Sequence, residues 1–176
     1  MAPGVVIVTH YRLGEEFLQA LRLIVPDAPP FQDVSIDPKQ SVADMREAIA
    51  DALRRAAASQ APGSPGHQEA AGEGVLILTD MFGGTPSNMG LSFLEEHRVE
   101  VVTGLNLPML IKLATMTEKR PLEELAAFIK EYGQRNIRVA AEILPEGRRS
   151  TTSPRARESS RCATSSPSTR GRRGAS

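Results

Sequence analysis

Two titratable residues, His10 and Asp80, each follow directly on a short apolar run that carries no charge. An imidazole changes its charge near neutral pH, so it can serve as a nucleophile. A carboxylate that accepts a hydrogen bond from one ring nitrogen fixes the tautomer and leaves the lone pair of the other nitrogen free to attack. If the two runs are neighbouring strands, they predict a catalytic histidine, His10, that Asp80 orients. Taken alone, each residue also fits a structural role, as a loop-bonding histidine and as a turn aspartate.

The loop after Asp80 contains the sequence Gly83-Gly84-Thr85-Pro86. Paired glycines allow a positive φ and a close approach of backbone amides to a ligand. Thr85 as the N-cap and Pro86 as the first helical residue predict that a helix begins here. The free amides and the positive dipole end of that helix favour an anion, although two glycines before a helix are also common in ordinary turns. Combined with His10, this loop predicts a site that carries a phosphoryl group on histidine.

Apolar periodicity indicates an α/β fold that places these residues at strand ends. Uncharged β-branched runs predict strands buried on both faces, and the helical patterns between them imply right-handed crossovers. We predict a three-layer sandwich around a central, mostly parallel four-stranded sheet, with a further C-terminal strand at its edge or exchanged. The loops after the first, third and fourth strands should converge at one sheet edge, where ligands bind in such folds. The expected strands are 5–9, 31–36, 75–79, 99–103 and Ile137–Ile143, and the expected helices are 13–25, 42–57, 86–97, a short one after Pro108, and 121–132, which Gly133 ends.

Length and composition fit one domain, residues 1–146, followed by a tail, residues 147–176. The domain holds 13 Lys and Arg against 20 Asp and Glu, a net charge of −7, and the tail holds eight Arg and one Glu, a net charge of +7. An acidic domain argues against nucleic acid as its ligand. Residues 59–74 are rich in Ala, Gly, Pro and Ser and predict a flexible loop, and the tail is expected to be disordered.

Several sequence signals that are absent limit where the protein is expected to act and which cofactors it is expected to use. The sequence contains no run of 18 apolar residues and no export signal, so we expect a cytoplasmic protein without a membrane span. The single cysteine, Cys162, excludes an intrachain disulfide or a cysteine-based zinc site. No carboxylate cluster is placed to hold Mg²⁺ and no lysine-bearing phosphate loop is present, so we expect neither a metal, nor a cofactor, nor ATP as the donor.

The segments Gly4–His10, Leu76–Pro86 and Gly104–Met109 together resemble enzyme IIA of the mannose family of the bacterial phosphoenolpyruvate:sugar phosphotransferase system. The resemblance covers roughly residues 3–143, with the three motifs in the family's order. It implies an α/β sandwich, usually a homodimer joined through the C-terminal strand. It also implies a phosphotransferase that takes the phosphoryl group from the phosphorylated histidine carrier protein and passes it to an enzyme IIB during sugar uptake.

The resemblance implies that His10 is phosphorylated on Nε2 and that Asp80 hydrogen-bonds its ring. The residues expected to bind the phosphoryl group are Thr9, Phe82, Gly83, Gly84 and Thr85. The chain departs from the family at Tyr11, where glycine is usual, and in its Arg-rich tail. A phenol beside the nucleophile could hydrogen-bond the phosphoryl group or crowd a partner.

Two other functions fit parts of the sequence. The same domain could be a regulatory protein of a partial phosphotransferase chain, one that reports its phosphorylation state to a partner. A nucleotide- or flavin-binding module also fits a doubly wound sheet, but no Gly-x-Gly-x-x-Gly follows the first strand. The sequence does not identify the sugar.

Overall fold

The structure is a computed structural model that describes residues 3–58, 74–95 and 98–143. The expected flexible loop, apart from Gly74, and the expected tail lie outside the described residues. The chain divides into a unit Met1–Arg138, which contains the whole sheet, and a second unit from Val139 onward, of which only α6 (Ala140–Ile143) is a described element. No helix in the described ranges is long and apolar enough to cross a membrane.

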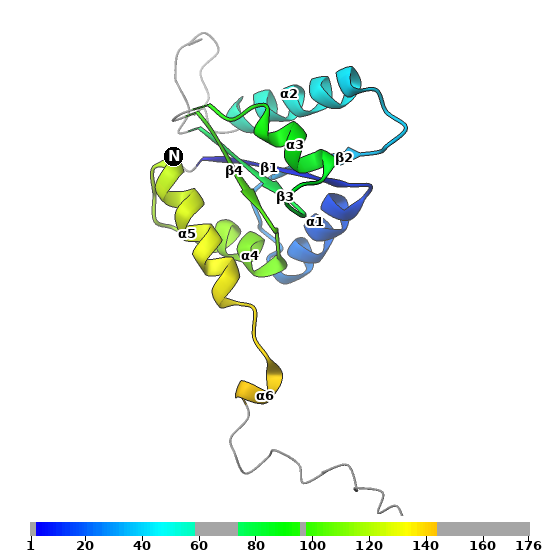
Figure 1. Cartoon of the computed structure of the whole chain (residues 1–176). Helices are drawn as coiled ribbons and strands as arrows, with labels where there is room; N and C mark the ends of the chain where they lie inside the picture. Colours follow the sequence, from blue (N-terminus) through cyan, green and yellow to red (C-terminus); the bar gives the residue numbers. More distant parts are fainter. Residues whose placement is uncertain (1–2, 59–73, 96–97, 144–176) are drawn as a thin grey trace, which may run out of the picture. The chain divides into compact units, whose positions relative to one another are not determined.

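Four parallel strands form the sheet in the order β2-β1-β3-β4 (Figure 1). The inner strands are β1 (Gly4–His10) and β3 (Val75–Thr79), and the outer strands are β2 (Gln32–Ile36) and β4 (Val99–Thr103). β3 is buried along its whole length, and β1 is buried up to its last residue. The four-stranded parallel sheet is therefore confirmed, and the two apolar runs before His10 and Asp80 are neighbours in it.

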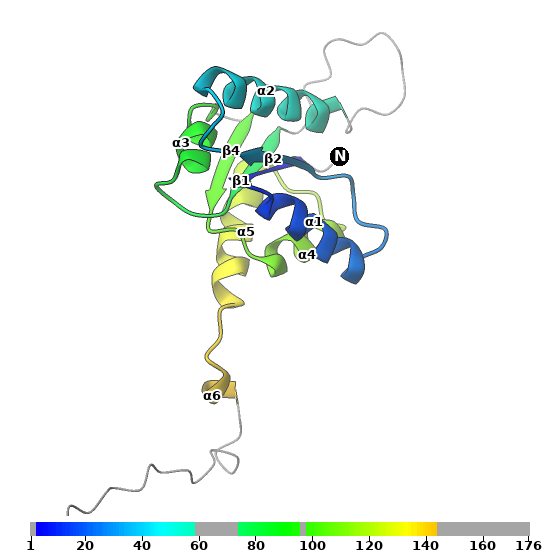
Figure 2. The ribbon, with the colours of Figure 1, turned by 90° about the vertical axis from the view of Figure 1, so that its right-hand side faces the viewer.

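Helices cover both faces of this sheet (Figures 1 and 2). One face carries α2 (Val42–Ala58) and α3 (Thr85–Leu91), and the other carries α1 (Leu13–Ile24), α4 (Leu107–Thr115) and α5 (Leu122–Arg135). The side chains of β1 alternate between the two cores: Val5 and Ile7 pack with α1, α4 and α5. Val6 and Val8 pack with α2 and α3. By the same alternation, consecutive residues at the end of β1 face opposite layers.

Two helices, α3 and α5, end more than one residue from the expected position. α3 ends at Leu91, where the Ser92 hydroxyl donates to the Met89 carbonyl, and the expected end at His97 lies outside the described residues. α5 continues through Gly133 to Arg135. A Cβ on Gly133 would lie 2.7 Å from the sulfur of Met109, so close packing, rather than the end of a helix, accounts for this glycine.

The expected last strand over Ile137–Ile143 is wrong for the described chain. Ala140–Ile143 form the short helix α6, and the side chains of Ile137 and Val139 are 75% and 58% exposed. A strand is stable only when its backbone groups pair with a neighbouring strand. No described strand pairs with this segment, so the helix propensity of its alanines and glutamate decides the local conformation.

Asn106 connects α4 to α5 through both ends of its amide, which makes it a test of this packing. Its Oδ1 accepts the Met109 N–H at 3.2 Å and its Nδ2 donates to the Gly133 carbonyl at 3.2 Å. Asn106→Ala should lower the free energy of unfolding by about 1–2 kcal/mol, because the helix cap and the bond to α5 are both lost. Asn106→Asp keeps the cap acceptor and should lose less, as measured by urea unfolding. Equal losses in the two variants would contradict a contribution from the cap.

Candidate functional site

The carboxyl ends of β1 and β3 bring His10 and Asp80 into direct contact. Strand pairing between β1 and β3 ends where Val8 lies opposite Thr79, so Asp80 follows the last paired residue. Its Oδ2 accepts two hydrogen bonds from His10, one from the backbone N–H at 3.0 Å and one from ring Nδ1 at 2.8 Å. The Asp80 side chain is 11% exposed and the His10 side chain 35%. The hydrogen bond that the sequence predicted is present, and the imidazole stays open to a partner.

The surroundings of Asp80 keep its carboxyl group ionised. Burial alone would raise the pKa of Asp80, but the backbone and ring hydrogen bonds from His10, its charge and the Met81 amide together bring that pKa below its usual range. The Met81 N–H donates to Oδ1 at 2.9 Å. Because an ionised carboxylate can only accept hydrogen bonds, the proton of the neutral ring lies on Nδ1. Nε2 therefore holds the free lone pair of the neutral imidazole.

The two glycines of the loop after Asp80 meet two separate requirements. Gly83 has a φ of +83°, a conformation that a side chain disfavours. Gly84 lies against the imidazole: a Cβ there would be 2.7 Å from His10 Cε1 and 3.2 Å from Nε2. Only a residue without a side chain fits this close to the Cε1–Nε2 edge of the ring.

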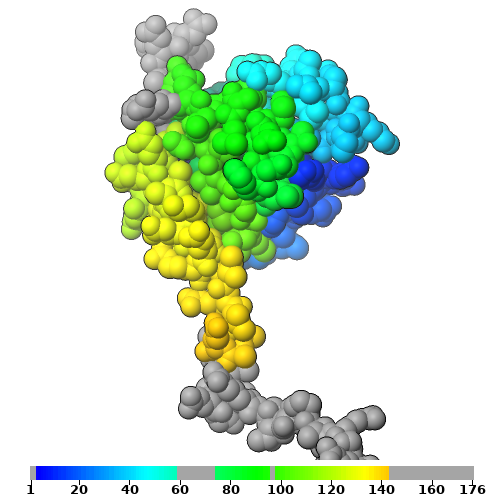
Figure 3. Space-filling view, in the orientation of Figure 1, coloured from blue at the N-terminus to red at the C-terminus, as the bar shows by residue number. Residues whose placement is uncertain are grey.

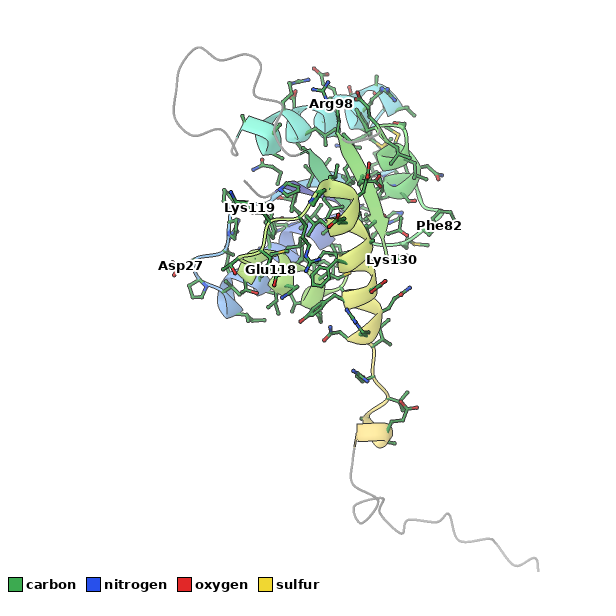
Figure 4. All side chains as sticks on the ribbon, turned by 90° about the vertical axis from the view of Figure 1, so that its left-hand side faces the viewer. Asp27, Phe82, Arg98, Glu118, Lys119 and Lys130 are labelled. Atoms are coloured by element: carbon green, nitrogen blue, oxygen red, sulfur yellow. The ribbon has the colours of Figure 1, made fainter. Side chains whose placement is uncertain are left out.

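The expected N-cap at Thr85 is wrong. Gly84 has the extended backbone of the N-cap, with φ −85° and ψ 172°, so Thr85 is the first helical residue and Pro86 the second. The glycine takes this position because its backbone must pass close to the imidazole. Thr85 is exposed at the start of α3, and Phe82 is exposed in the loop before it, with its side chain projecting away from the ribbon in Figure 4.

The structure separates Thr9 from this group. The Thr9 hydroxyl is fully buried and accepts the Gly14 N–H at 2.8 Å, so it holds the first turn of α1 against β1. Strand alternation turns Thr9 and His10 to opposite layers, a signal already present in the sequence.

The third expected loop, Gly104–Met109, makes contacts that hold β3, α4 and α5 together, and none of these contacts involves the imidazole. The backbone amides of Gly104 and Leu105 donate to the Thr79 carbonyl at 3.0 Å, and Asn106 connects α4 to α5. The first two loops do meet, and Figure 3 shows the green surface of the segment from β3 to β4 bordering the blue N-terminal segment.

Sequence reasoning missed two features of the site. One is the hydrogen bond from the Met81 amide to the second oxygen of Asp80. No local sequence pattern predicts this bond, because it depends on the conformation of the loop. The other is the backbone of Tyr11, whose φ is +47°. Among the described residues, no group of three or more His, Cys, Asp or Glu side chains could hold a metal ion.

A family model described as the PTS system fructose IIA component matches residues 66–130. The PTS system fructose-specific EIIA component of Bacillus subtilis is 38% identical over 71 residues, which cover 40% of this chain and 49% of that protein. The sorbose-specific EIIA component of Lacticaseibacillus casei is 25% identical over 126 residues, covering 71% of this chain and 81% of that protein. The chain thus matches about half the length of the first relative and most of the second.

Solved structures extend the likeness over most of the fold. The mannose/sorbose-specific IIA subunit of the phosphotransferase system from Enterococcus faecalis superposes with a TM-score of 0.66 and 28% sequence identity, covering 83% of this chain and 98% of that one. A PTS IIA protein associated with the fucose utilization operon of Streptococcus pneumoniae shares the fold, with a TM-score of 0.63 and 21% identity over 81% of this chain and 98% of that one.

Replacing Thr9 by valine tests its structural role. Thr9→Val keeps the shape but leaves the buried Gly14 N–H without its acceptor, so the free energy of unfolding should fall by about 1–3 kcal/mol. Thr103→Val is the matched control, because Thr103 also ends a strand and is only half-buried. Urea unfolding of both variants gives the comparison, and a Thr9→Val protein as stable as the control would contradict the role.

The lowered pKa of Asp80 predicts a pH dependence of stability. A carboxyl whose pKa is lower in the folded chain than in the unfolded one, where it is about 3.9, stabilises the fold at higher pH and loses this effect as the pH falls through the folded value. The difference in unfolding free energy between wild type and Asp80→Asn should therefore shrink as the pH falls from 5 to 3. Urea titrations at the two pH values measure it, because other groups titrate alike in both proteins. A constant difference would exclude the linkage.

Proposed function

Because these matches identify the chain as a mannose-family enzyme IIA of the phosphotransferase system, we propose that it carries a phosphoryl group on His10 during sugar uptake. The observation that carries this proposal is the double hydrogen bond from His10 to one oxygen of Asp80. It leaves Nε2 unprotonated on a ring that is partly open to solvent. The donor in this proposal is the phosphorylated histidine carrier protein, and the acceptor is an enzyme IIB.

In the transfer step, the lone pair of His10 Nε2 attacks the phosphorus held by the donor's histidine. The new P–N bond forms as the donor's P–N bond breaks, and the electron pair of the broken bond returns to the donor ring. The proton on Nδ1 stays on His10 throughout. The Asp80 carboxylate stabilises the positive charge that develops on the ring, as preorganised charge does in other group transfers. Transfer to the acceptor repeats the step in reverse.

The glycine loop supplies the surroundings of the phosphoryl group in this proposal. Gly84 leaves the space beside Nε2 that a side chain would fill. The Thr85 hydroxyl and the backbone of Gly83 and Gly84 bind the phosphoryl oxygens, and Phe82 borders them. Thr9 positions α1 and has no part in binding. We assign this role to residues 1–146, acting in the cytoplasm as a homodimer, as the resemblance to the family implies.

Phosphoryl transfer to purified chain tests the proposal. With phosphoenolpyruvate, enzyme I and the histidine carrier protein, the wild type should acquire one acid-labile phosphate, and His10→Ala should acquire none. His67→Ala and His97→Ala remove the two other histidines of the chain and are the matched controls, so both should label like the wild type. Undiminished labelling of His10→Ala would end the proposal.

Asp80→Asn tests the orienting carboxylate in the same assay. The asparagine can turn its NH₂ group toward Nδ1 and favour the tautomer with the proton on Nε2, which is no nucleophile. Labelling should slow by about 10²- to 10⁴-fold. A rate within twofold of the wild type would remove Asp80 from the mechanism.

A further inference from the structure

Tyr11 adopts a backbone conformation that its residue type disfavours. Among the described residues it is the only one other than glycine with a positive φ, at 47°. The chain leaves β1 here and turns toward α1, and the Tyr11 N–H donates to the Ile36 carbonyl at 3.0 Å. The turn therefore requires this conformation, which is a clear outlier for a bulky L-residue.

The described chain does not compensate for this strain. The Tyr11 side chain is 60% exposed. Its hydroxyl has no hydrogen-bond partner among the described residues, and its ring takes part in none of their aromatic or cation–π contacts. Glycine would make the same turn without strain. Strained residues cluster at functional sites, so this outlier points to a group beyond the described residues that contacts the tyrosine.

Tyr11 is one of four exposed apolar residues that lie within three positions of His10 or Asp80 along the chain, and we define Tyr11, Leu13, Met81 and Phe82 as the apolar rim. Their exposed fractions are 60%, 43%, 53% and 74%. The first two follow His10 along the chain and the last two follow Asp80, which His10 contacts directly; Figure 4 shows Phe82 projecting outward. Apolar side chains around a half-exposed polar centre are typical of protein interfaces, where tyrosine contributes a large, rigid, amphipathic surface.

The charges beside the rim favour a protein over a small anion. None of the four rim residues is charged. The cation next to Tyr11 in the sequence, Arg12, forms a salt bridge from Nε to Glu15 Oε2 at 2.8 Å, and its Nη2 lies 3.9 Å from Glu16 Oε1. A small polyanionic donor such as phosphoenolpyruvate carries several negative charges and needs free cations or a metal to neutralise them. A protein whose phosphorylated residue lies within an apolar surface matches this rim better.

We propose that Tyr11 determines specificity by contacting the protein that donates the phosphoryl group to His10. This inference rests on the proposed function. Tyr11 acts on docking: its ring becomes buried against the donor, and that burial offsets the strain of the turn. The reactivity of His10 itself is set by Asp80 and does not depend on Tyr11.

Labelling by two different phosphoryl donors distinguishes an effect of Tyr11 on docking of the donor protein from an effect on the reactivity of His10. The histidine carrier protein must dock to deliver its phosphoryl group, whereas phosphoramidate is small enough to reach the imidazole without contacting the rim. The test variant is Tyr11→Asn, because asparagine tolerates a positive φ but lacks the ring. Tyr11→Phe keeps the ring, and Leu23→Asn is the matched control on α1, where Leu23 is 87% exposed.

Tyr11→Asn should raise the KM for the carrier protein about tenfold, as expected for the loss of one buried interface tyrosine, with kcat within about twofold of the wild type. Its labelling by phosphoramidate should be unchanged, and its Tm should not fall. Tyr11→Phe and Leu23→Asn should keep the KM of the wild type.

An unchanged KM in Tyr11→Asn would overturn the inference while leaving the proposed function intact. Equal slowing with both donors would also overturn it, because Tyr11 would then act on the imidazole instead of on docking. Failure of the wild type to be labelled on His10 by the carrier protein would instead refute the proposed function, and the inference with it.

Discussion

One carboxylate oxygen, Oδ2 of Asp80, holds the site together. Asp80 lies just past the last paired residue of β3, and this oxygen accepts one hydrogen bond from the backbone N–H of His10 and one from its ring Nδ1. A single atom therefore fixes both the end of β1 and the tautomer of the imidazole. The second oxygen accepts the Met81 amide and thereby fixes the start of the loop that brings Gly84 against the ring. These donors outweigh the effect of burial, so the group keeps the charge that its role requires. Geometry, charge and loop conformation thus depend on the same side chain.

The sheet and the pairing of its inner strands could be predicted because their signals are local. An uncharged β-branched run can be buried on both faces, and β3 and β4 begin and end at the residues that their apolar runs predicted. Once β1 and β3 are neighbours, the residues that follow their apolar runs meet at one edge. The contact between His10 and Asp80 was therefore accessible from the sequence, while its second hydrogen bond, from the His10 backbone, was not.

The errors arose where a residue's environment decides between two locally reasonable conformations. The segment Ile137–Ile143 has the pattern of a strand but no described partner strand, so α6 forms at its end. Gly84 displaces Thr85 from the N-cap because the imidazole lies beside it, which is a tertiary constraint. Thr9 is different: the alternation of β1 already turned it away from the His10 layer, and the expectation that it binds a phosphoryl group overlooked that signal.

The register between β1 and β3 decides to which side of the sheet the His10 imidazole points, so its phosphorylation under the proposed function depends on correct strand pairing. A slip of one residue would rotate every side chain of β1 to the opposite layer and direct the imidazole into the space that α1 occupies. Such a mispaired copy would present the Thr9 hydroxyl where the imidazole belongs, and under the proposed function it would take up no phosphoryl group. Under the proposed function, the phosphate incorporated per molecule would therefore count the native molecules in a preparation.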